Sequence, residues 1–118
     1  MQKTLLTNQR LQSIMIKMFG KSNKIDYKYN EGQLIKELTK YIDNTYSQHY
    51  SLNKYQSTEF IIDSGHGEGF CIGNIMKYAQ RYGKKGGRNR ADLLKVLHYA
   101  LFMLYVHDKK METKNDKN

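Results

Sequence analysis

Residues 73–99 of the chain read GNIMKYAQRYGKKGGRNRADLLKVLHY. Apolar residues recur at helical spacing on both sides of its centre, GKKGGRN at 83–89. Glycines end helices, and a short connection makes the two flanking helices antiparallel neighbours. The stretch therefore predicts an antiparallel helix pair joined by a basic, glycine-rich turn.

Apolar periodicity places four main helices along the chain. We expect them at residues 7–19, 31–43, 70–82 and 90–107. Thr7 is the expected N-cap of the first helix and Gly20 its stop, and Asn89 is the expected N-cap of the last helix. The predicted fold class is mostly α, a small helical domain.

In the segments between these helices, the sequence patterns that indicate secondary structure are weaker. Alternation over residues 25–29 suggests a short strand, and the polar residues 44–56 read as a loop. Ser57 or Thr58 can cap a short helix that ends before SGHGEGF, residues 64–70, breaks the chain. The predicted organisation is an N-terminal helical extension at 1–46, a core domain at 47–107 and a flexible charged tail at 108–118.

Length and charge narrow the class of protein. A chain of 118 residues forms one small domain with a thin core, which favours a homo-oligomer. The net charge of +9 favours anionic partners such as nucleotides or nucleic acid, although solubility alone also explains it. No stretch approaches the length of a membrane span. The single cysteine, Cys71, cannot form an internal disulfide, so we expect a cytoplasmic protein with Cys71 as a small buried side chain.

Two polar helix faces flank the turn. One carries Asn74, Lys77 and Arg81 at i, i+3 and i+7, and the other carries Asp92, Lys95 and Tyr99 at the same spacing. If the helices are antiparallel, the two faces meet in one cleft. The turn continues this cleft with three basic residues, Lys84, Lys85 and Arg88.

Such a cleft suits phosphate. Arginine makes bidentate contacts to phosphate oxygens, lysines neutralise its charge, and glycines let backbone N–H groups approach an anion. Two simpler explanations stay open. Basic residues near a helix C-terminus stabilise that helix, and Asp92 can simply pair with Arg88 or Lys95.

The glycine motifs exclude some familiar sites. GHGEGFCIG, residues 65–73, is neither a dinucleotide fingerprint nor a Walker motif, and GKKGG is not a Walker motif either. A standard P-loop kinase is therefore excluded. His66 and Glu68 could act as a base or metal ligand, but loop polarity explains them equally well. We expect His98 to pack inside the protein.

Four segments, in order, resemble a family of small tailed-phage proteins: HY at 49–50, EFI at 59–61, GEGFCIGNIMKYAQRYGKKGG at 67–87 and ADLLKVLHYALFML at 91–104. That family is largely of unknown function and includes the nucleotide kinase of short-tailed coliphages, an enzyme without a P-loop. The resemblance implies a phage protein in an infected bacterial cell that acts as a deoxynucleoside monophosphate kinase-like phosphotransferase.

The resemblance also implies roles for the residues of the cleft. In a kinase, Arg81, Lys84 and Lys85 would stabilise the transferring phosphoryl group, and Asp92, or else Glu68, would hold the Mg²⁺ that accompanies a nucleoside triphosphate. Substrate binding would involve the remaining cleft and loop residues, His49, Tyr50, Gly73, Asn74, Lys77, Tyr78, Arg88 and Lys95.

Other functions fit the same sequence. One is a nucleotide-binding protein without catalysis, which acts as a sensor or as a sponge that sequesters a host signalling nucleotide. Another is a basic nucleic-acid binder whose tyrosines stack on bases. An interaction protein that blocks a host factor also stays open.

Overall fold

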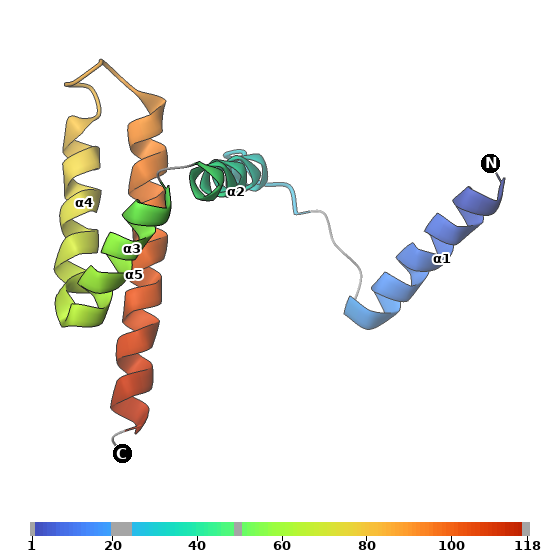
Figure 1. Cartoon of the computed structure of the whole chain (residues 1–118). Coiled ribbons are helices and arrows are strands. Elements are labelled where there is room, and N and C mark those ends of the chain that lie inside the picture. The colour runs from blue at the N-terminus through green and yellow to red at the C-terminus, as the bar shows by residue number, and fades with distance from the viewer. Residues whose placement is uncertain (1, 20–24, 49–50, 117–118) are drawn as a thin grey trace. The chain divides into compact units, whose positions relative to one another are not determined.

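The computed structural model describes residues 2–19, 25–48 and 51–116, and its regular elements there are all helical. They are α1 (Gln2–Phe19), α2 (Glu31–Ser47), α3 (Ser51–Ile61), a single π-helical turn (Ile62–His66), α4 (Gly67–Arg81) and α5 (Arg90–Asp116), coloured along the chain in Figure 1. The mostly α prediction is thus confirmed. No helix among these residues is long and apolar enough to cross a membrane.

The chain divides into two compact units, Met1–Glu31 and Gly32–Asn118. The first unit contains α1, which begins at Gln2, so Thr7 lies inside the helix and the expected cap there was wrong. The expected stop, Gly20, lies outside the described residues. Three apolar side chains of α1 are exposed: Leu11 at 54%, Ile14 at 49% and Met15 at 58%.

Residues 25–29 form no strand, because Ile25, Tyr27 and Tyr29 stand exposed with no strand beside them in the described chain. The backbone N–H of Tyr29 instead donates to Glu31 Oε1 at 2.7 Å, where α2 begins. The left-handed φ of 63° at Asn30 turns the chain into that helix.

The loop expected at 44–56 is mostly helix. α2 continues to Ser47 and α3 begins at Ser51, so neither Ser57 nor Thr58 is a cap. Both hydroxyls donate to carbonyls one turn earlier in α3, each at 3.0 Å. Side chains of α2 and α3 meet, since Thr45 Oγ1 lies 2.7 Å from Tyr55 Oη.

The predicted break at SGHGEGF is a kink between helices. Gly65 has a φ of 92°, which favours glycine, and α4 begins two residues later, at Gly67. Gly67 is buried, and a Cβ built on it would lie 3.0 Å from Val106 Cγ2 of α5. The absence of a side chain at this position lets α4 approach α5 closely.

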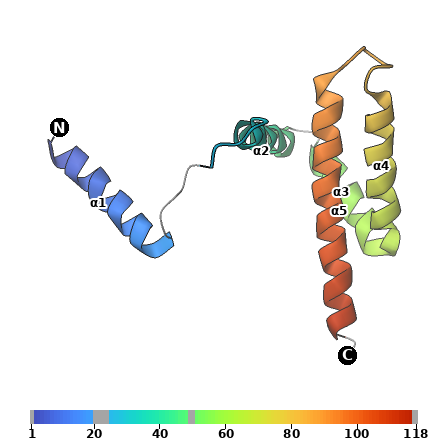
Figure 2. The same cartoon turned by 180° about the vertical axis from the view of Figure 1, so that it is seen from behind.

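α4 and α5 form the predicted antiparallel hairpin and lie side by side in both views (Figures 1 and 2). The N–H of Tyr82 donates to the Tyr78 carbonyl at 3.2 Å, and Gly83 follows with a φ of 86°, a glycine C-terminal stop. Asn89 Oδ1 accepts the Ala91 N–H at 3.0 Å, so the predicted cap is confirmed. α5 then runs to Asp116, beyond the expected end at 107.

The buried side chains of this hairpin are of mixed chemical character. Cys71 is fully buried, as expected, together with Val106, Asp92 and His98. Six large apolar side chains of α4 and α5 are 42–65% exposed, namely Ile72, Met76, Leu93, Leu97, Leu101 and Leu104, whereas Ile75, Leu94 and Val96 are half-buried. Aromatic and polar side chains therefore share the buried part of the hairpin with aliphatic ones such as Val106.

Candidate functional site

An aromatic cluster occupies the middle of the hairpin. Tyr78 of α4 stacks on Tyr99 of α5 with centroids 5.9 Å apart and planes 14° apart. Phe70 and Phe102 each form an edge-to-face pair with Tyr99, with ring centroids 5.8 and 5.7 Å apart. His98 lies 4.5 Å from the Phe102 ring, which extends the cluster toward α2. Tyr99 thus has one stacked and two edge-to-face ring neighbours, the arrangements that aromatic pairs prefer.

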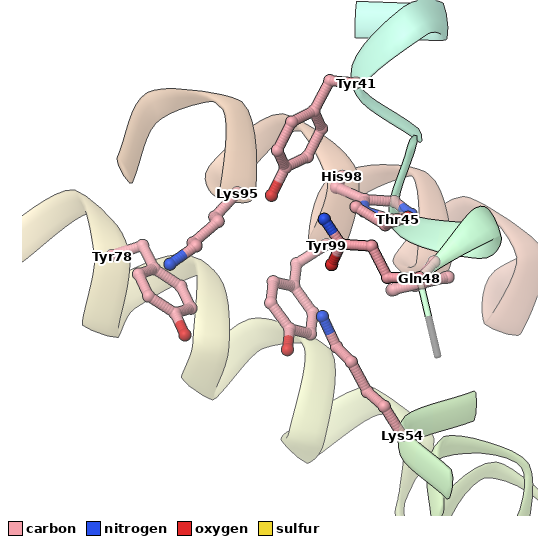
Figure 3. Close-up of a pocket in the computed structure, with 9 residues that line it drawn as sticks. Tyr41, Thr45, Gln48, Lys54, Tyr78, Lys95, His98 and Tyr99 are labelled. Carbon is pink, nitrogen blue, oxygen red and sulfur yellow. The ribbon is translucent and has the colours of Figure 1, made fainter. Parts of the chain in front are cut away.

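Beside this cluster is a cavity of about 380 Å³. Figure 3 shows its polar side chains converging on one space from α2, α3, α4 and α5. The lining residues are Tyr41, Thr45, Gln48, Lys54, Tyr78, Lys95, His98, Tyr99 and Phe102. We call this cavity the tyrosine–lysine pocket.

The charge of the pocket is positive. Lys95 Nζ lies 4.9 Å from the centroid of the Tyr78 ring, and Lys77 Nζ approaches the same ring at 5.4 Å. Lys54 brings a second ammonium group to the lining from α3. None of the described lining residues is acidic. Cations over an aromatic face, in a lining whose described residues include no carboxylate, favour an anionic ligand.

The buried polar groups of the pocket stay neutral near pH 7. Burial, followed by the charge of Lys54, lowers the pKa of His98 below its ordinary 6.5. Burial, followed by the neighbouring Tyr78, raises the pKa of the Tyr99 hydroxyl. At neutral pH the imidazole and the phenol are therefore uncharged, and the lysines supply the charge of the pocket.

Two of the predicted catalytic residues meet at the turn end of the hairpin. Arg81 Nε lies 3.8 Å from Asp92 Oδ1, so the two polar faces do meet here. Asp92 is 1% exposed and faces the arginine, not the expected partners Arg88 or Lys95. A carboxylate enclosed in this way does not fit the predicted role of a Mg²⁺ ligand. The described residues also contain no group of three or more His, Cys, Asp or Glu side chains that could hold a metal.

The glycine-rich turn uses part of its backbone internally. The Gly83 N–H donates to the Gly87 carbonyl at 2.9 Å, and the N–H groups of Lys84 and Lys85 donate to the Arg81 carbonyl. These three N–H groups are therefore not free to bind an anion. The side chains of Lys84, Lys85 and Arg88 are exposed and do not line the pocket.

The other predicted substrate residues are dispersed. Tyr78 and Lys95 line the pocket, and Lys77 touches it only through the Tyr78 ring. Asn74 Nδ2 donates to the Phe70 carbonyl of its own helix at 2.9 Å, and Gly73 is an exposed position with nothing near its Cβ direction. The predicted residues His49 and Tyr50 lie outside the described residues.

Sequence reasoning missed the wall of the pocket that α2 and α3 supply. Tyr41, Thr45 and Gln48 follow i, i+4 and i+7 spacing, the signal of one helix face. That signal was available in the sequence, but it crosses the boundary at residue 43 where the helix was expected to end. His98 was expected to pack, and it is buried while also lining the pocket.

These features define a class: a small helical protein with a cationic, aromatic pocket beside an antiparallel hairpin. Residues 44–101 match the model of a family described as a protein of unknown function, DUF3310. No curated protein and no solved structure matches the chain. The match spans α3, α4 and the first part of α5, and so includes most of the pocket lining. The resemblance to a family largely of unknown function is thus supported, and the phage origin and kinase activity stay predictions.

Proposed function

We propose that this protein binds a nucleotide in the tyrosine–lysine pocket. The base would lie against the tyrosine rings, and the phosphate would lie against the ammonium groups of Lys54 and Lys95. One observation carries the proposal: aromatic rings and two lysines line a single cavity in which no described lining residue is acidic.

The chemistry of the lining matches both parts of a nucleotide. Stacking on an aromatic side chain contributes about 1–3 kcal/mol per base and tolerates any base. The ammonium groups attract phosphate as mobile point charges. The cavity of about 380 Å³ lies in the size range of small-molecule pockets. A ligand with only one of these parts would leave half of the lining unused.

Binding is better supported than phosphoryl transfer. The arrangement of Arg81 and Asp92 offers no open carboxylate for Mg²⁺, so our proposal includes no catalytic step. The kinase activity implied by the family resemblance is checked by adding a triphosphate donor and Mg²⁺ to the binding mixtures and separating the products.

The proposal is tested by titrating the purified protein with ribo- and deoxynucleoside monophosphates in a calorimeter. Lys95→Ala should weaken binding about tenfold, because it removes a charge that contacts phosphate. Lys109→Ala is the matched control, since Lys109 also lies over a tyrosine ring, Tyr105 at 5.7 Å, but does not line the pocket.

If the Lys95→Ala and Lys109→Ala variants bind the nucleotide with equal affinity, the proposed location of the binding site is contradicted. Binding of long single-stranded oligonucleotides without binding of mononucleotides, with a steep dependence on salt, would instead favour the nucleic-acid function. Absence of any nucleotide binding would contradict the function itself.

A further inference from the structure

The pair Arg81–Asp92 is an unusual feature of the hairpin. Asp92 is 1% exposed, and Arg81 Nε and Asp92 Oδ2 are buried without a hydrogen-bond partner in the described part of the chain. Their closest approach, 3.8 Å between Arg81 Nε and Asp92 Oδ1, is too long for a hydrogen bond. A buried carboxylate with such poor pairing destabilises a fold unless another interaction compensates for it.

The two side chains differ in their access to solvent. The Asp92 side chain is 2% exposed, whereas 32% of the Arg81 side chain is exposed. A guanidinium group is planar, with five N–H donors in a fixed geometry. Nε is the one Arg81 nitrogen that is buried without a hydrogen-bond partner among the described residues, so the two terminal nitrogens are not in that buried, unpaired state.

The pair lies next to the pocket along both helices. Arg81 follows the pocket residue Tyr78 by three positions on α4, and Asp92 precedes the pocket residue Lys95 by three positions on α5. Residues three apart share a helix face and are neighbours. Arg81 and Asp92 therefore lie one helical turn from the pocket lining, on the side of the glycine-rich turn.

We infer that the terminal nitrogens of Arg81 bind a phosphate oxygen of the ligand, and that Asp92 is the positioning residue that holds Arg81 there. This inference rests on the proposed nucleotide site. The bidentate geometry of a guanidinium group suits phosphate better than a lysine does. Asp92 restricts the arginine to one orientation, so less conformational entropy is lost when the phosphate binds.

The test compares a nucleoside with its monophosphate for each protein. The ratio of the two affinities measures what the phosphate contributes, and a loss of fold would change both affinities together. Asp92→Asn keeps the size of the side chain and removes its charge. Arg81→Lys keeps a positive charge but removes the planar guanidinium group with its five N–H donors. Glu37→Gln is the matched control, since Glu37 pairs with Arg90 outside the pocket.

Each of the two variants should reduce the phosphate contribution about tenfold and leave the nucleoside affinity unchanged. The double variant should lose little more than either single one, because the two residues act as one unit. Circular dichroism and thermal unfolding check that each variant is folded.

An unchanged ratio in both variants, with nucleotide binding intact, would overturn the inference and leave the proposed function standing. Equal losses for nucleoside and nucleotide would also overturn it, since they indicate a purely structural pair. A wild-type protein that binds neither compound would overturn both proposals.

Discussion

His98 illustrates how one residue links packing to the pocket. Its side chain is 5% exposed, edge-on to the Tyr41 ring at 6.0 Å and close to Phe102. Lys54 of α3 adds a positive charge on the pocket side. A protonated imidazole would thus be both desolvated and repelled, and the folded protein favours the neutral form.

This gives a pH prediction for the free energy of unfolding. Because the pKa of His98 is lowered on folding, its contribution is fully present above about pH 6.5 and is lost as the pH falls through the lowered value. Denaturant unfolding should therefore show less stability near pH 5 than near pH 7.5, and His98→Gln should remove part of this difference. The exposed His107 provides the control His107→Gln. Identical pH dependences for the two variants would contradict the assignment to His98.

Among the helices, the approach of α4 to α5 depends on a glycine. The Cβ direction of Gly67 meets Val106 Cγ2 at 3.0 Å and Ile62 Cγ1 at 3.2 Å, whereas that of Gly69 meets nothing within 4 Å. The two positions are in the same turn of α4, so they separate steric effects from helix propensity.

Gly67→Val should destabilise the protein by about 1–3 kcal/mol, because a branched side chain overfills the contact between the helices. Gly69→Ala should instead stabilise it by about 0.5–1 kcal/mol, since alanine favours the helix and nothing obstructs it. Thermal unfolding of both variants measures the difference. A Gly67→Val variant as stable as the wild type would show that the close contact is absent.

The hairpin was the most predictable element, because its signals are local. The glycine after Tyr82 and the Asn89 cap act through neighbouring backbone atoms, and the structure has both. The helical residues within 44–56 were predicted as a loop, because this polar segment is kept helical by tertiary contacts that the sequence does not reveal. Tyr46 and Tyr55 stack with centroids 4.2 Å apart, and residues separated by nine positions reveal no such contact in the sequence.

In the molecule as a whole, helical periodicity alone does not decide which face of α5 is buried. On α5 the leucine stripe and the face that carries Tyr99 and Val106 both satisfy helical periodicity, and hydrophobicity alone favours the leucines. The second face packs on α4, and this places Lys95 and Asp92 toward the pocket side. Lys84, Lys85 and Arg88 were placed in the site from their charge and their position after the helix, and Lys84 and Lys85 also from the family resemblance. None of these features shows where a side chain points. The homo-oligomer stays a prediction, which sedimentation analysis can check.

Chemical-shift mapping shows whether a nucleotide binds in the tyrosine–lysine pocket. A nucleoside monophosphate is titrated into the ¹⁵N-labelled protein while amide spectra are recorded. The largest shifts should fall on Tyr78, Lys95 and Tyr99, with little change over the lysine-rich end of α5 at 109–114. Shifts confined to that end of α5, or no shifts at all, would contradict binding in this pocket.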